Sequence, residues 1–519
     1  MQELRWWQRA VIYEIYPRSF QDSNNDGIGD LNGILRRLDY LVQLQVDAIW
    51  IAPVYPSPMS DFGYDVADYC GIDPIFGTIK DFDRLLFECH QRGLRVILDF
   101  VPNHTSDQHP WFLESKSSRE NPKRDWYLWR DEPNNWLSQF GGSAWEFDAT
   151  SGQYYCHSFL KEQPDLNWRN PAVKDAMFDV LRFWLDRGVD GFRVDVMWLM
   201  IKDEQFRDNP PNPGYVTGNP SNQRLLSVFN SDQPEVHPLV AEMRAVVDGY
   251  DDRVLIGEIY LPVQLLMTYY GGDVQEANLP FNFLLLQCAW SAEPVRTTIS
   301  EYMAALPPGA WANWVLGNHD NARIASKVGT RQAPVAAMLL LTLPGTLTMY
   351  YGEEIGMTNV PIAPEDVKDP AEKNQPGIGM GRDPERTPMQ WDSSPNAGFT
   401  TAVPWLPLAS DCDKNNVASL IEDSASILGL YQRLIALRRN HQALVSGALS
   451  QPSAEGNLLR YERVDAEETL LILLNFGFDP VEAEVQHGTI LCSTCFDRNE
   501  YRVENTVTVL GAEGLIILC

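Results

Sequence analysis

The chain has 519 residues, of which 44% are hydrophobic, and a formal net charge of -29. That length suits one large catalytic domain with a smaller second domain, and the charge argues against nucleic acid and anionic membranes as partners. The 16 Trp and 20 Tyr favour a carbohydrate ligand, because aromatic faces stack on sugar rings, although core packing alone would also explain them.

The N-terminal segment carries no targeting signal that we recognise. Residues 1–9 lack the apolar stretch of a signal peptide, and no run approaches the length of a transmembrane helix. We therefore expect a cytoplasmic protein, whose eight cysteines remain thiols. Cys492 and Cys495 form one CxxC, but no second pair accompanies it, so we do not expect zinc there.

Apolar runs of strand length alternate with helical patterns over about the first 440 residues. Val173, Met177, Val180, Leu181 and Trp184 illustrate the helical spacing. Seven runs predict buried strands, and an eighth, weaker one is expected near Asn278–Phe283. The seven are Val11–Tyr16, Val46–Ile51, Leu94–Phe100, Gly191–Val194, Val254–Ile256, Trp314–Leu316 and Thr346–Tyr350. Repeated βα units of this length predict a (β/α)₈ TIM barrel.

Two long connections and a strand-rich end complete the predicted organisation. Residues 105–169 and 353–410 are too long for ordinary barrel loops, and loops of this size are usually functional. After the last barrel helix, short apolar runs predict a small antiparallel domain. We expect a barrel of residues 1–104 and 173–445, an inserted domain B of residues 105–172, and a C-terminal β-sandwich of residues 446–519.

The segment Gly191-Phe-Arg-Val-Asp-Val196 ends the fourth strand with an arginine and an aspartate two residues apart. Strand alternation points Arg193 and Asp195 to the same side. A guanidinium beside a carboxylate favours its ionised form, as a carboxylate nucleophile requires. A buried structural ion pair would have the same sequence, so this segment alone does not decide between the two interpretations.

Further acidic residues follow other predicted strands. Glu258 follows the fifth strand in Ile-Gly-Glu-Ile-Tyr, and Asp320 follows the seventh in Gly-Asn-His-Asp-Asn. With Asp195, three acids would converge at one end of the barrel, where barrel enzymes hold their active sites. A glycosidase needs one ionised and one protonated carboxyl group. The apolar neighbours of Glu258 suit a raised pKa.

These segments resemble the α-amylase superfamily, glycoside hydrolase family thirteen. The matching signatures are DFVPNH, GFRVDV, GEIY and GNHDNAR, in their family order along the chain. Gln163-Pro-Asp-Leu-Asn167 resembles the marker of the oligo-1,6-glucosidase branch, and Arg386-Thr-Pro-Met-Gln-Trp391 resembles exo-acting α-glucosidases. The resemblance covers essentially the whole chain.

The resemblance implies roles for the matching residues. Asp195 would be the nucleophile, Glu258 the general acid/base, and Asp320 a third catalytic acid that holds sugar hydroxyls. Arg386 would close the pocket together with Asp61, with Arg382 as a less favoured substitute. The other implied substrate-binding residues are Tyr64, His104, Phe159, Arg193, Val196 and His319. Tyr64 and Phe159 could instead be core aromatics, and His104 a structural histidine at a strand end.

An Asp-rich segment after the first strand is a candidate metal loop. Asp22, Asn24 and Asp26 lie at positions one, three and five, and glycine follows, as in the first half of an EF-hand loop. Ile28 would offer its carbonyl oxygen and Asp30 a further oxygen. Position twelve is Gly33 rather than glutamate, so this is not an EF-hand. Similar loops in oligo-1,6-glucosidases hold Ca²⁺, and we expect a structural calcium ion here, although a turn without an ion has the same composition.

The resemblance implies a retaining exo-acting α-glucosidase that releases α-glucose from short α-linked oligosaccharides. Val196, after the nucleophile, goes with α-1,6 activity in related enzymes. However, one methyl or hydroxyl group is worth only ~1–3 kcal/mol, so it tilts a linkage preference and does not set it. The bulky segment Met197–Asp203 and the insert Asp203–Pro238 differ from the expected pattern and leave linkage and acceptor open.

Three alternatives remain at this point. The first is a glucosyltransferase or sucrose-acting enzyme of the same family, which product analysis would distinguish. The second is a catalytically inactive binding subunit, which usually lacks the carboxylates and carries a membrane span. The third is an unrelated metal-dependent barrel enzyme, which would need clustered His and carboxylate ligands. We expect small α-glucosides as partners, with no nucleic acid and no membrane, and the sequence does not fix the oligomeric state.

Overall fold

The computed structural model describes residues 4–519. Its largest part is a barrel of eight parallel strands in the order β10-β11-β1-β2-β3-β7-β8-β9, and a parallel bridge between Asn282 and Trp314 links its two ends. The strands are β1 (Val11–Ile15), β2 (Ala48–Ile51), β3 (Arg95–Phe100), β7 (Gly191–Val194), β8 (Val254–Gly257), β9 (Leu279–Pro280), β10 (Asn313–Val315) and β11 (Thr346–Tyr350). The predicted TIM barrel is confirmed, and the weak eighth strand is the short β9.

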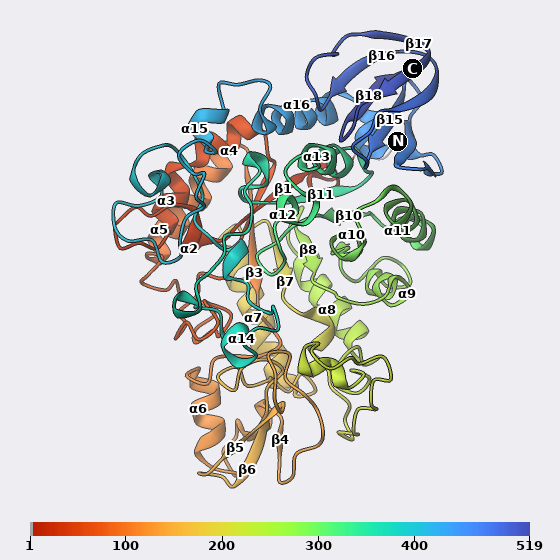
Figure 1. Cartoon of the computed structure of the whole chain (residues 1–519). Coiled ribbons are helices and arrows are strands. Elements are labelled where there is room, and N and C mark those ends of the chain that lie inside the picture. Colours follow the sequence, from red (N-terminus) through yellow and green to blue (C-terminus); the bar gives the residue numbers. More distant parts are fainter. Residues whose placement is uncertain (1–3) are drawn as a thin grey trace.

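Helices lie around the strands (Figure 1). In α7, Asn170 caps the first turn and Pro171 occupies the first helical position, where its missing N–H costs nothing. Its buried face includes Val173, Met177 and Trp184, at the predicted helical spacing. The helices are α1 (Trp6–Arg9), α2 (Pro17–Phe20), α3 (Leu31–Arg36), α4 (Leu38–Leu44), α5 (Ile79–Gln91), α6 (Pro110–Ser117), α7 (Pro171–Asp186), α8 (Val236–Asp248), α9 (Val263–Leu266), α10 (Leu284–Gln287), α11 (Ala292–Ala305), α12 (Ile324–Val328), α13 (Ala333–Thr342), α14 (Pro370–Asn374), α15 (Val417–Leu420), α16 (Ile427–Asn440) and α17 (Gln442–Ser446).

The long connection after β3 forms a small body at one end of the molecule (Figure 1). Its strands β4 (Trp129–Arg130), β5 (Trp145–Asp148) and β6 (Gln153–Cys156) pair in the antiparallel order β4-β6-β5. Trp136 and Trp145 belong to a separate hydrophobic cluster here. The sheet returns to the barrel through a bridge between His104 and Asp165, which holds this insert over the carboxyl end of β3.

The C-terminal strands form one antiparallel sheet at the opposite end of the molecule (Figure 1). They are β12 (Ala448–Leu449), β13 (Ser453–Glu455), β14 (Leu458–Val464), β15 (Thr469–Asn475), β16 (Val481–Ser493), β17 (Arg502–Val509) and β18 (Gly514–Leu518). The sequence patterns predict strands at Asn457–Tyr461, Thr469–Asn475, Glu482–Val485 and Gly514–Leu518, which fall on β14, β15, β16 and β18. They miss β12, β13 and β17 and cover only four residues of β16. All seven strands belong to one hydrogen-bonded antiparallel sheet, which confirms the antiparallel C-terminal domain.

Alternation along β15 explains how this sheet packs. Leu470, Ile472 and Leu474 join the main core of the barrel, whereas Leu471 and Leu473 join a second cluster within the sheet. Successive strand residues point to opposite faces, so one strand contributes to both cores. This continuous apolar contact attaches the sheet to the barrel.

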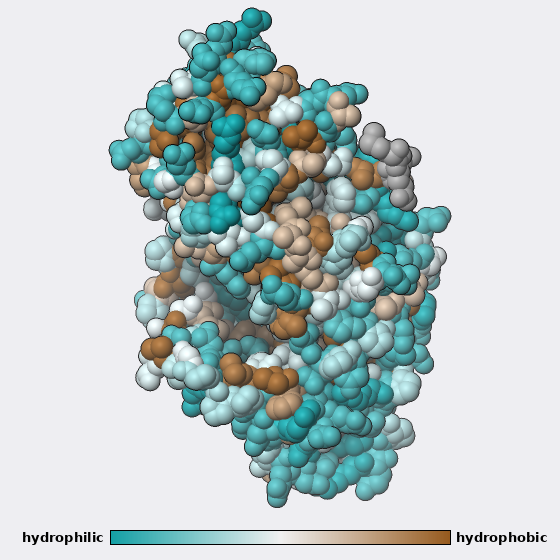
Figure 2. Space-filling view, turned by 90° about the vertical axis from the view of Figure 1, so that its right-hand side faces the viewer, coloured by the Kyte–Doolittle hydropathy of each residue, from teal (hydrophilic) through white to brown (hydrophobic). Residues whose placement is uncertain are grey.

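The surface in Figure 2 is mainly hydrophilic, with hydrophobic residues in scattered groups. Within residues 4–519, no helix combines the length and apolarity needed to cross a membrane. All eight cysteines are unpaired, which agrees with the expected thiols.

Candidate active site

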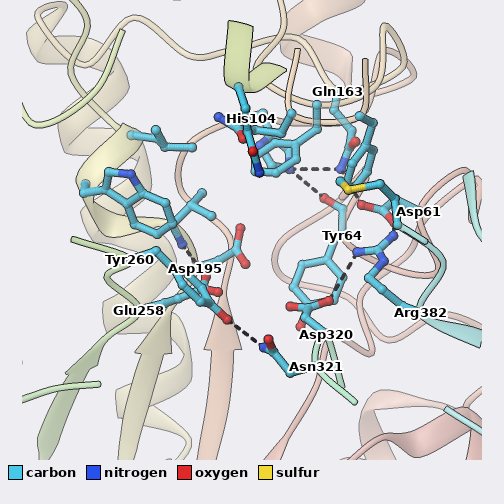
Figure 3. Close-up of a pocket in the computed structure, with 18 residues that line it drawn as sticks. Asp61, Tyr64, His104, Gln163, Asp195, Glu258, Tyr260, Asp320, Asn321 and Arg382 are labelled. Carbon is cyan, nitrogen blue, oxygen red and sulfur yellow. Dashed lines mark hydrogen bonds and ion pairs between the residues drawn. The ribbon is translucent and has the colours of Figure 1, made fainter. Parts of the chain in front are cut away.

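A pocket of about 480 Å³ lies at the carboxyl ends of the barrel strands. Figure 3 shows Asp195, Glu258 and Tyr260 on one side, with Asp61 and Arg382 on the other. Pockets of a few hundred Å³ suit small ligands. The lining residues are Asp61, Tyr64, His104, Gln139, Phe140, Phe159, Gln163, Asp195, Val196, Trp198, Leu199, Gln223, Glu258, Tyr260, Asp320, Asn321, Met380 and Arg382. The three predicted catalytic acids therefore face one cavity.

Arg193 lies buried beneath this pocket and connects its acids. Its partner in the β3–β7 register is Asp99. Nη1 donates to Asp99 Oδ1 and to Asp195 Oδ1, both at 2.8 Å, and Nη2 lies 2.7 Å from Glu258 Oε2. The guanidinium also lies 5.1 Å from the Trp50 ring centre. Because one buried cation serves three carboxyl groups, the arrangement is more than the simple ion pair that the sequence left open.

The backbone turns sharply just after Asp195. Val196 has φ 38° and ψ 47°, a left-handed conformation that is unfavourable for a β-branched residue. Its N–H donates to Glu258 Oε2 at 2.8 Å. The strained turn thus brings a backbone donor to Glu258, and Val196 lines the pocket. Its contact with a substrate stays a prediction.

Burial changes the protonation of the two central acids. It raises the pKa of Glu258 to about 7, although Arg193 opposes the rise. Burial likewise raises the pKa of Asp195, against the same arginine. Coupled carboxyl groups titrate together, so this pair retains a proton near neutral pH. Arg193 contacts both acids, Asp195 through Nη1 and Glu258 through Nη2, so its charge opposes the protonation of either one.

Asp320 lies among positive groups. Asp320 Oδ1 lies 2.7 Å from Arg386 Nη2 and 3.2 Å from Arg382 Nη1. Asp320 Oδ2 lies 3.3 Å from His319 Nε2. Burial alone would raise the pKa of Asp320, but these neighbours lower it below the usual range. Asp320 is therefore an ionised acceptor that faces the cavity.

The two arginines of the loop after β11 have exchanged their predicted places. Arg382, which we considered the weaker candidate, lines the pocket, and its Nη2 lies 2.7 Å from Asp61 Oδ1. Arg386 is fully buried and donates through Nε to the carbonyl oxygen of His319 at 2.7 Å. The prediction that Arg386 closes the pocket with Asp61 is wrong, because Arg386 is bound to Asp320 and to the His319 carbonyl instead. Asp369 binds Arg382 Nε at 2.6 Å and holds Arg382 beside Asp61.

His104 and Phe159 form the wall under the inserted sheet. Their ring centres are 5.3 Å apart, and both line the pocket. Gln163 Nε2 reaches Asp61 Oδ2 at 3.2 Å and lies 3.1 Å from His104 Nε2. Burial lowers the pKa of His104 to about 4, so its imidazole is neutral. These aromatics line the pocket, as does Tyr64, whose carbonyl oxygen lies 3.1 Å from His104 Nε2 (Figure 3).

Several lining residues escaped the sequence prediction. Tyr260 directly follows the Gly-Glu-Ile motif and stacks on Phe283, with ring centres 4.2 Å apart. Its position two residues after Glu258 is a sequence signal that could have identified it as a pocket residue. Gln139, Phe140 and Met380 come from irregular loops, and Gln223 from a short 3-10 helix, Ser221–Arg224. None of these segments has a periodic apolar pattern.

Asn222 and Ser221 tie three segments together at the rim. Asn222 Nδ2 donates to Gln139 Oε1 at 2.7 Å, and the N–H of Ser221 donates to Gln375 Oε1 at 2.9 Å. The insert Asp203–Pro238 thereby contacts both the inserted sheet and the loop after β11. The contact lies beside Gln139 and Gln223, which line the pocket.

The predicted metal loop is remote from this pocket. Asp22 Oδ1 accepts from the N–H of Asn24 at 2.9 Å, Asp26 Oδ1 from that of Ile28 at 2.8 Å, and Asp30 Oδ1 from that of Gly33 at 2.7 Å. Across residues 4–519, no group of three or more His, Cys, Asp or Glu side chains is arranged to hold a metal. The loop still presents hard oxygen donors of the kind that Ca²⁺ binds, so calcium there stays a prediction.

Known proteins resemble this chain over almost its whole length. The α-amylase catalytic domain model matches residues 14–447. A probable alpha-glucosidase of Rhizobium meliloti (strain 1021) is 42% identical over 92% of this chain and 91% of its own length. An oligo-1,6-glucosidase of Parageobacillus thermoglucosidasius is 40% identical over 91% of this chain and 90% of its own length. The solved structure of an alpha-glucosyl transfer enzyme, XgtA, superimposes with a TM-score of 0.94 at 38% identity, over 99% of this chain and all of that one.

Proposed function

The chain belongs to the α-amylase family and is a glycoside hydrolase, and we propose that it is a retaining exo-acting α-glucosidase of short α-linked gluco-oligosaccharides. The observation that carries this proposal is the pair of contacts that Arg193 makes with Asp195 and Glu258. Two carboxyl groups that share one guanidinium lie close together, as the retaining mechanism requires.

In the first step, Asp195 attacks the anomeric carbon from one face of the sugar. Glu258 gives its proton to the glycosidic oxygen as the bond to the leaving sugar breaks, so the leaving group departs as a neutral alcohol. Asp195 is then bound covalently to the glucosyl unit, and Glu258 is left as a carboxylate.

In the second step, a water molecule attacks the same carbon. Glu258 takes a proton from that water and the bond to Asp195 breaks, which restores both acids and gives α-glucose. Asp320, fixed as an ionised acceptor, would hold sugar hydroxyls during both steps. A sugar hydroxyl can replace water as the acceptor, so transfer is the second candidate activity. The similarity of the chain to an α-glucosyl transfer enzyme is a reason to test for transfer products.

The shape of the pocket supports short substrates released from the non-reducing end. Arg382 and Asp61 close one side, which leaves no room for a chain to continue past the bound glucose. On the other side, the contact of Asn222 with Gln139 narrows the approach of the leaving sugar. Maltose- and isomaltose-sized substrates fit this geometry better than long polymers.

We also propose a structural Ca²⁺ ion on the loop after β1. Asp22, Asn24, Asp26 and Asp30 would hold it through side-chain oxygens, and Ile28 through its carbonyl oxygen. Such an ion would neutralise the clustered acids and stabilise the turn, away from the reacting atoms.

The deciding experiment is an NMR time course with maltose, isomaltose, sucrose and p-nitrophenyl α-glucoside. α-Glucose as the first product would support the double displacement, and the relative rates would rank the linkages. Larger oligosaccharides would favour the transferase. β-Glucose first, or no turnover of any substrate, would refute the proposal.

A further inference from the structure

Glu14 on β1 is a buried acid that none of the steps above uses. Its side chain is completely buried, and its Oε1 lies 2.5 Å from Nδ1 of His319. The imidazole is held between two tyrosine rings, with centre distances of 5.7 Å to Tyr16 and 5.3 Å to Tyr64. A ring so enclosed has one orientation, so the proton positions within this pair decide what His319 presents to the pocket.

The other nitrogen of the imidazole faces two oxygen atoms. His319 Nε2 lies 2.6 Å from the hydroxyl of Tyr64 and 3.3 Å from Oδ2 of Asp320. Because Arg382 and Arg386 keep Asp320 ionised, a bare lone pair on Nε2 would face a negative oxygen. A proton on Nε2 converts this repulsion into an attraction.

Tyr64 supports the same assignment. Its hydroxyl has a single proton to donate, and Asp99 Oδ2 lies within reach at 3.0 Å. If Nε2 carries a proton, His319 donates to the Tyr64 oxygen and Tyr64 donates to Asp99. If Nε2 is bare, it competes with Asp99 for the same proton. Either Nε2 then has no donor, or Asp99 Oδ2 keeps only the longer contact from Trp50 Nε1, at 3.3 Å.

Glu14 determines which of these arrangements holds. Its second oxygen, Oε2, is buried without a hydrogen-bond partner among the described residues, and a charged oxygen left in that position is costly. A protonated carboxyl group would donate to Nδ1 and leave only a neutral carbonyl oxygen unpaired. Burial, aided by the nearby Asp320 and Asp99 and opposed by Arg193, raises the pKa of Glu14.

We propose that Glu14 is a positioning residue that keeps its proton, donates it to Nδ1 of His319, and thereby holds the imidazole in the tautomer with Nε2 protonated. Acting through His319, it orders the donors toward Tyr64, Asp99 and Asp320. Since Asp320 is the acid assigned to the sugar hydroxyls, the catalytic consequence rests on the proposed function, whereas the tautomer does not.

The tautomer can be measured without any substrate. NMR of protein labelled with ¹⁵N in the histidine rings, with His319→Asn to assign the signals, should show a protonated Nε2 and a bare Nδ1 at neutral pH. Glu14→Gln should preserve that signature, because an amide N–H can donate to Nδ1 as the carboxyl group does. Glu14→Leu removes the donor and should alter it.

Kinetics provide the second readout. We expect Glu14→Leu to lower kcat/KM at least 30-fold, mainly through kcat, and Glu14→Gln to recover most of that loss. A bare Nε2 in the wild-type protein, or a Gln variant as impaired as the Leu variant, would overturn the assignment. A correct tautomer in a protein without α-glucosidase activity would instead refute the proposed function alone.

Discussion

Arg382 joins Asp61 across one side of the pocket, with Nη2 2.7 Å from Oδ1. The same guanidinium reaches Asp320 at 3.2 Å and is anchored by Asp369. A cation held by three carboxylates cannot swing away at little cost, so this side of the pocket is rigid. Under the proposed function, that rigidity would limit the substrate to one sugar beyond the scissile bond on this side.

Replacing Arg382 should therefore impair substrate binding more than folding. Charge-assisted hydrogen bonds are worth ~1.5–3 kcal/mol each, so we expect Arg382→Ala to lower kcat/KM roughly 10- to 200-fold, mostly through a higher KM. Arg382→Lys should recover only part of the lost kcat/KM, since a lysine ammonium group cannot reproduce the planar, two-pronged hydrogen bonding of the guanidinium. In the matched variant Arg386→Ala, the loss of a fully buried arginine should lower the unfolding temperature much more. Equal effects of the two alanine variants on KM would contradict the assigned exchange of places.

The exchange of these arginines shows where sequence reasoning stops. The apolar runs predict where the strands end, and the barrel topology brings those ends together. The grouping of Asp195, Glu258 and Asp320 could therefore be predicted. Arg382 and Arg386 lie four residues apart in a loop of little regular structure. Neither the helical nor the strand periodicity of apolar residues applies there, so the sequence does not indicate which arginine faces the pocket. The anchor, Asp369, is distant from the motifs in sequence.

Glu14 and Tyr260 failed to be predicted for different reasons. Glu14 stands in an apolar strand, and its significance depends on a contact with a residue 305 positions away. Tyr260 is adjacent to Glu258, but its role depends on a turn after β8. In the C-terminal sheet, β17 reads Arg-Val-Glu-Asn-Thr-Val-Thr-Val, with exposed residues at most of its early positions, so its apolar pattern is weak.

If Glu258 is the general acid, its pKa should set the alkaline limit of activity. Only the protonated form can donate to the leaving group, so kcat/KM should fall as the pH rises through about 7. Glu258→Gln should remove this limb and depress maltose hydrolysis about 10³-fold, in the upper part of the range for general acid catalysis. The loss for p-nitrophenyl α-glucoside should be smaller, because its leaving group departs without help. An alkaline limb retained in the Gln variant would exclude Glu258 as the acid.

Removal of the nucleophile should have a larger effect than removal of any other group. Asp195→Asn replaces an anion by a neutral amide of the same shape, and we expect kcat to fall by about 10⁴-fold or more. The Asp195→Asn variant should still fold, since the substitution removes one negative charge from a group of closely spaced acids. Asp175→Asn, on the exposed face of α7, is the matched control. Near-normal turnover by a preparation of Asp195→Asn that mass spectrometry shows to be free of wild-type protein would exclude a covalent intermediate on this residue.

The rim contact should control the length of the substrate. Asn222→Ala removes the hydrogen bond to Gln139, and one such bond is worth about 1 kcal/mol, or roughly 5-fold. We expect the ratio of kcat/KM for maltotriose to that for maltose to rise by about this factor, because the entrance widens while the catalytic acids stay in place. Val216→Ala, at an exposed position of the same insert outside the pocket lining, should leave the ratio unchanged. An unaltered ratio in the Asn222 variant would show that the insert does not limit chain length.

Calcium on the loop after β1 should appear as a gain in stability that is separate from catalysis. A ligand that binds only the folded state at 100 times its Kd contributes about 2.7 kcal/mol, which corresponds to a rise of roughly 2–5 °C in the unfolding temperature for a protein of this size. Asp26 is the informative position, because it is exposed and lies away from the buried contact of Asp22 with Thr400. Asp26→Asn should abolish the response to Ca²⁺ and leave the unfolding temperature in EDTA near that of the wild type. Differential scanning calorimetry with Ca²⁺ and with EDTA measures both quantities, and identical wild-type curves in the two buffers would refute the calcium site while leaving the catalytic assignments untouched.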